Sequence, residues 1–137
     1  MIELGGLFFR REMRILTYGT FDLLHEGHLR LLHRASKLGK LYVGVSTDDF
    51  CRVKGKTPII SDWIRFCSVQ ALPFVEKTLY EYSFEQKRED IDRYNIDLLV
   101  MGDDWAGKFD HLGVETLYFP RTPGTSTSYL KEIFNSE

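Results

Sequence analysis

The stretch Leu16-Thr17-Tyr18-Gly19-Thr20-Phe21-Asp22-Leu23-Leu24-His25-Glu26-Gly27-His28 joins a predicted strand to a predicted helix. Residues 15–18 are apolar enough for a short buried strand, and the pair Gly19-Thr20 ends that strand with a tight turn. From about residue 27, leucines and an alanine recur at spacings of three and four, which predicts a helix to about residue 38. In an open α/β sheet, the crevice at such a strand exit is where ligands bind.

Two histidines, His25 and His28, lie where this strand gives way to the helix. Free backbone N–H groups and the helix dipole favour a phosphate at a helix N-terminus. Gly27, between the histidines, lets a ligand approach the backbone closely because it has no side chain. A single histidine here is commonly a surface or capping residue, but two around a glycine favour a ligand site. We therefore predict that both imidazoles contact a phosphate.

Composition limits the functions that are open to this chain. Its 137 residues suit one domain with one core, and 43% hydrophobic and 28% charged residues are typical of a soluble globular protein. The formal net charge of −2 argues against nucleic acid and against a membrane surface as partners, so anions would bind at local clusters of cations. No apolar run reaches the ~18 residues that a membrane span needs.

The cysteines and the N-terminus bear on location and domain boundaries. Cys51 and Cys67 form no CxxC or metal-ligand pattern, so we interpret them as reduced thiols of a cytoplasmic protein. The N-terminus lacks the basic start and long apolar core of a signal peptide. We expect residues 1–12 to be an extension, either from an upstream start site or as an arm, and residues 13–137 to form the one domain.

Further strands and helices alternate along the chain. Strands are predicted over residues 41–46, 74–79, 97–101 and 116–119, helices over 63–71 and 83–94, a loop over 47–60, and a last helix from Ser126 or Thr127. Phe84, Ile91 and Tyr94 would form the inner face of the helix at 83–94. This alternation predicts a Rossmann-like three-layer α/β/α fold with a parallel five-stranded sheet and right-handed crossovers.

Lys54-Gly55-Lys56 places two ammonium groups in the predicted loop after the second strand. A triphosphate needs several cations to neutralise it, and we expect Arg65, on the next helix, to join these lysines. A solvated surface loop is the alternative for a Lys-x-Lys pattern on its own.

Gly102-Asp103-Asp104-Trp105 leaves the end of the fourth predicted strand. The two carboxylates would hold Mg²⁺ or accept hydrogen bonds from a ligand, since Mg²⁺ prefers oxygen ligands. The alternative is a turn that caps a helix. Trp105 is a candidate core residue.

Residues 121–128 follow the fifth predicted strand and combine a guanidinium, a glycine and several hydroxyl groups at the start of a helix. Such a segment is a second cradle for phosphate oxygens, the alternative being an over-capped helix start. All of these clusters lie at the carboxyl ends of predicted strands. We therefore predict a nucleoside triphosphate site, with no acidic dyad or Ser-His-Asp set that would indicate hydrolysis.

Gly19-Thr20-Phe21-Asp22 followed by His25-Glu26-Gly27-His28 resembles the signature of the cytidylyltransferase family, within the nucleotidyltransferase superfamily. The pattern Arg121-Thr122-x-Gly124-x-Ser126-Thr127 makes the resemblance specific for that family, and it extends from residue 14 to about residue 133. The further stretches that resemble the glycerol-3-phosphate branch are Ser46-Thr47-Asp48, Glu85-Gln86-Lys87, Asn95-Ile96-Asp97, Met101-Gly102-Asp103-Asp104-Trp105 and Gly107-Lys108-Phe109-Asp110.

The resemblance implies roles for individual residues. The implied catalytic residues are His25, His28, Lys54 and Arg121, with the histidines stabilising the transition state at the CTP phosphates. The implied CTP-binding residues are Gly19, Thr20, Phe21, His25, Gly27, His28, Lys56, Asp104, Arg121, Thr122, Gly124, Ser126, Thr127 and Ser128. Lys54 and Lys87 would bind the acceptor phosphate. The family is typically dimeric and uses Mg²⁺, so a homodimer and Mg²⁺ bound with CTP are expected.

The implied activity is transfer of a cytidylyl group from CTP to sn-glycerol 3-phosphate, giving CDP-glycerol and pyrophosphate for teichoic-acid or capsule precursors. Phosphocholine, phosphoethanolamine or a capsule-sugar phosphate are alternative acceptors. A nucleotide-binding module with weakened catalysis is the alternative outside the enzymes.

The chain departs from the family pattern at three positions. Pro73 stands where the family carries an Arg that matters for activity, which bears on the rate, the acceptor placement or the dimer contact. Glu26 replaces a usual Trp in the wall of the site, and Pro123 replaces a usual Glu.

Overall fold

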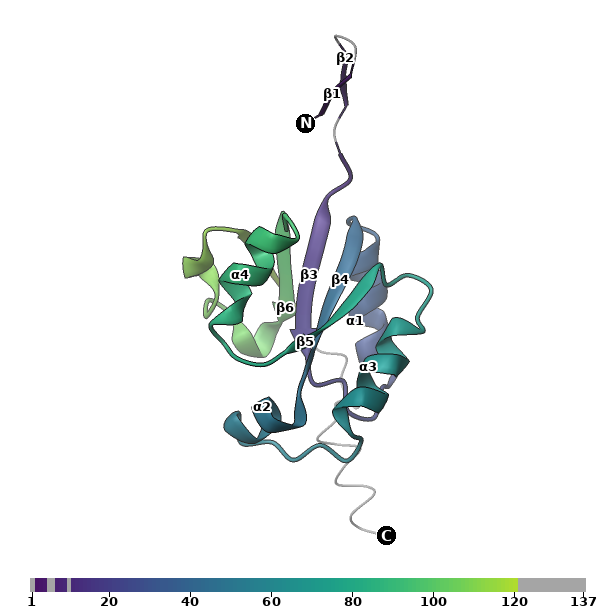
Figure 1. Cartoon of the computed structure of the whole chain (residues 1–137), viewed down its shortest axis with the longest axis vertical. Coiled ribbons are helices and arrows are strands. Elements are labelled where there is room, and N and C mark those ends of the chain that lie inside the picture. Colours follow the sequence, from purple (N-terminus) through teal and green to yellow (C-terminus); the bar gives the residue numbers. More distant parts are fainter. Residues whose placement is uncertain (1, 5–6, 10, 121–137) are drawn as a thin grey trace.

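A computed structural model of the chain describes residues 2–4, 7–9 and 11–120 (Figure 1). Within these residues, the main sheet has five parallel strands in the order β5-β4-β3-β6-β7. This confirms the predicted Rossmann-like α/β fold with a parallel five-stranded sheet. The strands are β3 (Arg14–Gly19), β4 (Lys40–Ser46), β5 (Lys77–Glu81), β6 (Leu98–Gly102) and β7 (Glu115–Phe119).

Helices cover both faces of this sheet, with α1 and α3 on one side and α4 on the other (Figure 1). No helix in the described ranges is both long and apolar enough to cross a bilayer. The helices are α1 (Glu26–Ser36), α2 (Asp48–Val53), α3 (Asp62–Gln70) and α4 (Gln86–Arg93), and short 3₁₀ turns are η1 (Asp103–Trp105) and η2 (Asp110–Leu112).

The central strands β3, β4 and β6 are mostly buried and apolar because helices cover both faces of the sheet there. Successive residues point to opposite faces, so Ile15 packs with α1 and α3 while Leu16 packs on the side of α4. β6 divides in the same way, with Val100 on the first side and Leu99 on the second. The two resulting cores hold the carboxyl ends of the strands at one edge of the sheet.

The strand order places β3 between β4 and β6, at the point where the winding of the chain reverses. Open α/β sheets bind ligands outside the carboxyl ends of their strands at this switch point. The turn after β3, the lysines after β4 and the aspartates after β6 all leave this edge, as predicted. The predicted cradle at residues 121–128, with the last helix, lies outside the described residues.

The first residues form a structure that the sequence reading did not predict. β1 (Ile2–Leu4) and β2 (Leu7–Phe9) pair as an antiparallel two-stranded sheet, which projects from the amino end of β3 (Figure 1). Arg11, which follows, donates a hydrogen bond of 2.8 Å to the carboxylate of Asp97, just before β6. The proposed domain boundary after residue 12 stays a prediction.

The predicted loop over residues 47–60 was wrong in its first part, which forms helix α2. The Oγ1 of Thr47 accepts a hydrogen bond of 3.0 Å from the backbone N–H of Phe50 and caps this helix. Phe50 and Cys51 lie on the buried face of this helix. Six residues are too few for a helical hydrophobic period to be visible, so the capping threonine is the signal that could have identified it.

Two further predicted boundaries were displaced. The strand expected over residues 74–79 begins at Lys77, because the backbone N–H of Val75 bonds at 3.1 Å to the carbonyl of Leu72 in a turn. The helix expected over 83–94 begins at Gln86, whose side chain accepts a 3.0 Å hydrogen bond from the backbone N–H of Ser83. Phe84 therefore precedes this helix and is 41% exposed, contrary to its predicted inner position, whereas Ile91 and Tyr94 do pack against the core.

Candidate active site

The turn after β3, residues 19–28, is called the histidine turn here, and it ends on the helix cap of α1. His25 is the N-cap residue, and its Nδ1 accepts a 3.0 Å hydrogen bond from the backbone N–H of Gly27. The Nδ1 of His28 accepts a 3.3 Å hydrogen bond from the backbone N–H of His25. The two rings stack with their centroids 3.9 Å apart. Both histidines therefore cap helix α1, as the alternative interpretation of the sequence expected, because each ring accepts a hydrogen bond from a backbone N–H at the helix start.

These hydrogen bonds determine the tautomer of both rings. A neutral imidazole carries its proton on one nitrogen, and each Nδ1 here acts as an acceptor, so the proton of each ring is assigned to Nε2. Burial and the neighbouring His25 lower the pKa of His28 to about 3, against the opposing effect of Asp22, and burial also lowers the pKa of His25. The histidine turn therefore presents neutral Nε2–H donors at pH 7.

The backbone of the histidine turn is held in a strained form. Phe21 and Leu23 both have positive φ angles, of 54° and 49°, which non-glycine residues seldom adopt. The ring of Phe21 folds back so closely that a Cβ on Gly19 would lie 2.8 Å from it. The same ring meets the His28 ring edge-on at 5.5 Å. Gly19 and Phe21 thus hold His28 in position.

Hydrogen bonds of Asp22 and Arg65 connect neighbouring segments of the chain to the histidine turn. The carboxylate of buried Asp22 accepts hydrogen bonds of 2.7 and 2.9 Å from the backbone N–H groups of Ile59 and Ile60. Arg65 is 1% exposed; it donates to the carbonyls of Thr20, Ser46 and Ile60 and pairs with Asp48. The prediction that Arg65 joins the predicted phosphate-binding lysines was wrong, because its guanidinium donates its hydrogen bonds to these carbonyls and to Asp48.

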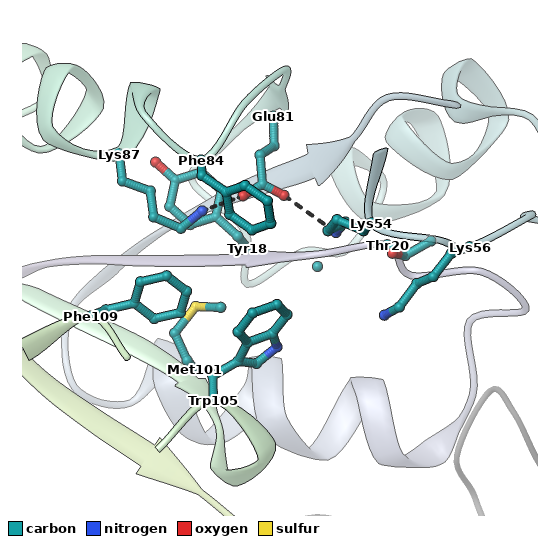
Figure 2. A pocket seen from close by; sticks show the side chains of 11 residues that line it. Tyr18, Thr20, Lys54, Lys56, Glu81, Phe84, Lys87, Met101, Trp105 and Phe109 are labelled. Atoms are coloured by element: carbon teal, nitrogen blue, oxygen red, sulfur yellow. Dashed lines mark hydrogen bonds and ion pairs between the residues drawn. The ribbon is translucent and has the colours of Figure 1, made fainter. Parts of the chain in front are cut away.

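Beside the histidine turn, a pocket opens at the carboxyl ends of β3, β5 and β6 (Figure 2). It is partly open to solvent and has a cavity volume of about 40 Å³, well below the roughly 300–1,000 Å³ of sites that enclose a drug-sized ligand. We call it the lysine pocket, and its lining residues are Tyr18, Gly19, Thr20, Lys54, Lys56, Glu81, Phe84, Lys87, Met101, Trp105 and Phe109. It thus brings together three predicted lysines with Gly19 and Thr20 of the histidine turn.

Glu81 organises the lysine pocket, and the sequence analysis missed it. One carboxylate oxygen lies 2.6 Å from the Nζ of Lys87, and the other lies 3.8 Å from the Nζ of Lys54 (Figure 2). Ser46 bridges the longer pair, since its hydroxyl donates to Glu81 at 2.7 Å and accepts from Lys54 at 2.8 Å. Burial lowers the pKa of Lys54, and the charge of Glu81 partly restores it. The carboxylate therefore keeps two buried ammonium groups facing one pocket.

Aromatic residues and Met101 form most of the remaining wall of the lysine pocket. Trp105, predicted as a core residue, is half-buried and lines the pocket with Phe84 and Phe109. Tyr18 donates a 2.7 Å hydrogen bond to buried Asp90 on α4, and burial together with this carboxylate raises its pKa. No pattern in the sequence indicates this aromatic set, because its members come from β3, η1 and segments beside α4 and η2.

In the part of the chain that the structure describes, the aspartates after β6 belong to no preformed set of metal ligands. Among the described residues, no three His, Cys, Asp or Glu side chains gather closely enough to hold a metal ion. Asp103 and Asp104 lie exposed in η1. Mg²⁺ often keeps phosphate and water as most of its ligands, so its arrival with CTP stays a prediction. The predicted contacts of Arg121, Thr122, Gly124, Ser126, Thr127 and Ser128 lie outside the described residues.

Comparison with known proteins identifies the family. A family model described as cytidylyltransferase-like matches residues 16–133. A glycerol-3-phosphate cytidylyltransferase of Bacillus subtilis (strain 168) is 48% identical over 122 residues, which cover 87% of this chain and 95% of that protein. The protein of the same name from Staphylococcus aureus (strain NCTC 8325 / PS 47) is 39% identical over 122 residues, with 87% and 92% covered.

A solved structure shares the fold. The lipopolysaccharide core biosynthesis protein from Thermoplasma volcanium GSS1 superposes with a TM-score of 0.67 at 24% identity, covering 82% of this chain and 98% of its own. That likeness concerns the fold alone. The family model, in contrast, spans most of the chain, and the curated relatives align along nearly their whole length, so the chain belongs to the cytidylyltransferase-like family.

Proposed function

We propose that this protein transfers a cytidylyl group from CTP to sn-glycerol 3-phosphate and releases CDP-glycerol and pyrophosphate. The relatives named for this activity support the proposal. The observation that carries it is the junction of two phosphate-binding arrangements: Gly19 and Thr20 belong both to the histidine turn and to the lysine pocket. A nucleotide phosphate on the histidine turn would then lie beside an acceptor phosphate in the lysine pocket.

The reaction needs positioning and charge stabilisation rather than a covalent enzyme intermediate. A phosphate oxygen of the acceptor attacks the α-phosphorus of CTP in line, and the bond to the pyrophosphate oxygen breaks. His25 and His28 would donate from Nε2 to the phosphate oxygens, where negative charge develops. A bound triphosphate would also raise the pKa of both imidazoles, because an adjacent anion favours their charged form.

The lysines would divide between the two substrates. Lys54 and Lys87 face the interior of the pocket beside Glu81 and are proposed to hold the acceptor phosphate. Lys56 lies on the same side of the pocket as Lys54 in Figure 2 and is proposed to contact CTP. Arg121 and the hydroxyl groups after it are proposed as the second CTP-binding segment, with Mg²⁺ bound to the nucleotide.

Three further properties belong to the same proposal: a homodimer, a cytoplasmic location, and a role in teichoic-acid or capsule precursor synthesis. Their support is the family and its relatives. A second candidate function, a nucleotide-binding module with weakened turnover, is favoured only by Pro73, which stands where the family carries an Arg.

Pyrophosphate release tests the proposal directly. The purified chain is incubated with Mg²⁺, one of the four nucleoside triphosphates, and one of a panel of phosphorylated alcohols, and the product is identified by mass spectrometry. We expect CDP-glycerol from CTP and sn-glycerol 3-phosphate. Turnover of ATP at a rate similar to CTP would contradict the cytidylyl specificity. CTP binding without turnover for any acceptor would instead support the weakened module.

A further inference from the structure

The ammonium group of Lys87 lies inside a cage of aromatic rings. Its Nζ is 4.5 Å from the ring centre of Tyr18, 5.1 Å from that of Phe109 and 5.4 Å from that of Phe84 (Figure 2). The carboxylate of Glu81 completes the enclosure at 2.6 Å, and Lys87 is 2% exposed. Several aromatic faces around one cation form the arrangement by which proteins recognise quaternary ammonium ligands.

The three rings of this cage also line the lysine pocket, so the ammonium group of Lys87 faces any acceptor that binds there. Tyr18, Phe84 and Phe109 all line the pocket, as do the three lysines and Glu81. Three ammonium groups and one carboxylate leave the lining with a formal charge of +2. A phosphate is attracted to such a lining, whereas a second cation attached to the acceptor is repelled by it.

We propose that Lys87 determines acceptor specificity, because its ammonium fills the aromatic cage that the cationic head of a phosphorylated amino alcohol would need. The site then accepts phosphorylated alcohols whose alcohol part is uncharged, such as polyol phosphates, and rejects phosphocholine and phosphoethanolamine. This inference rests on the proposed cytidylyl transfer and narrows its acceptor class. It differs from the proposed contact between Lys87 and the acceptor phosphate, which would favour every phosphorylated alcohol equally.

The parent protein provides the first test. kcat/KM is measured with saturating CTP for sn-glycerol 3-phosphate, phosphocholine and phosphoethanolamine. We expect the two cationic acceptors to be at least 100-fold poorer. Phosphocholine turnover within tenfold of glycerol 3-phosphate would overturn the inference and leave cytidylyl transfer intact. Turnover of a different neutral polyol phosphate, but not of glycerol 3-phosphate, would contradict the proposed acceptor while supporting the inference.

If no acceptor supports turnover, the affinity of the site for each acceptor tests the inference instead. sn-Glycerol 3-phosphate and phosphocholine are titrated calorimetrically into the parent protein in the presence of CTP. A dissociation constant at least tenfold lower for glycerol 3-phosphate supports the inference. Equal constants, or binding of neither compound, would overturn it.

The variant Lys87→Ala tests the cage itself. The measured quantity is kcat/KM for phosphocholine divided by kcat/KM for glycerol 3-phosphate, because loss of a phosphate contact affects both values and cancels from the ratio. Emptying the cage should raise this ratio at least tenfold, since Glu81 and three rings then face the choline head. A ratio within threefold of the parent value would show that Lys87 is only a phosphate ligand or a structural residue.

Two further variants make this comparison robust. Lys108→Met removes an exposed lysine that also lies near an aromatic ring, 5.6 Å from the centre of Trp105, but outside the cage, so the ratio should stay within twofold of the parent value. Lys87→Met keeps most of the side-chain volume if the alanine variant does not fold. With the charge removed, its ratio should rise at least threefold, and an unchanged ratio would again overturn the inference.

Discussion

The histidine turn and the lysine pocket meet at one edge of the sheet, yet they are built in opposite ways. In the histidine turn, the two histidines are positioned by contacts between residues two or three positions apart, namely His25 with Gly27 and His28 with His25. In the lysine pocket, Ser46 and Glu81 are 35 residues apart. The first presents neutral donors at pH 7, and the second presents buried ammonium groups held by a carboxylate. The two proposed phosphate sites of one protein thus depend on local backbone geometry in one place and on long-range ion pairing in the other.

The largest expected effect concerns the histidine turn, whose donors are neutral at pH 7. His28→Ala should lower kcat by about 100- to 1,000-fold, because a preorganised donor to the developing charge is lost. His28→Asn should lose nearly as much, although its side-chain oxygen can still accept from the backbone N–H of His25 and so preserve the helix cap. Steady-state kinetics give both values, and circular dichroism checks the fold.

The control for this experiment is His111→Ala, since His111 is exposed on η2. It should keep activity within twofold of the parent protein. A His28→Asn variant that is as active as this control would show that His28 only caps the helix, and the distinction between the two regions would then fail.

The next largest effect concerns the lysine pocket, whose ammonium groups are charged. Lys87→Ala should raise the KM for glycerol 3-phosphate by about 10- to 100-fold, the cost of losing one charge-assisted contact, and leave the Kd of CTP nearly unchanged. Acceptor kinetics and calorimetric titration of CTP measure the two quantities. Lys37→Ala, at the exposed end of α1, is the matched control. Equal losses for both substrates would mean that the two regions do not divide the substrates between them.

A smaller effect concerns how Glu81 maintains charge in the lysine pocket. Burial lowers the pKa of Lys54, and Glu81 raises it, with Cys51 acting in the same sense as Glu81 and both Lys56 and Lys87 acting against it. Glu81→Gln should therefore lower this pKa further. Because a lysine loses its charge as pH rises through its pKa, the alkaline fall of kcat/KM for the acceptor should move to lower pH.

This shift is measured by pH profiles for the acceptor and, separately, for CTP. The acceptor profile should move, and the CTP profile should not, since the histidines of the other region do not depend on Glu81. An unchanged acceptor profile would show that the charge of Lys54 does not limit acceptor use.

The smallest effect is expected at Pro73, which is exposed in the turn before β5. That turn precedes the amino end of the strand, whereas Glu81 and the lysine pocket lie at its carboxyl end. Pro73→Arg should therefore change kcat/KM for either substrate by less than about threefold. A gain of tenfold or more would mean that an arginine at this position reaches a site through a second copy of the chain.

The strand, turn and helix that carry the histidines were determined by the sequence itself. Hydrophobic spacing predicted β3 and α1, and the histidine cap depends on residues within one helical turn. The parallel direction of the strands also followed, because a helix between successive strands requires a crossover. Such signals are local, so they can be found without knowing which strands are neighbours.

The lysine pocket was decided by the tertiary structure. Ser46 and Glu81 become partners only through the register of β4 and β5, and that register places one carboxylate between Lys54 and Lys87. The cage around Lys87 likewise needs rings from three separate segments. A charged residue in a sequence looks the same whether it will be solvated or buried. Its environment depends on which distant side chains the packed sheet brings against it, and packing of that kind leaves no periodic pattern in the chain.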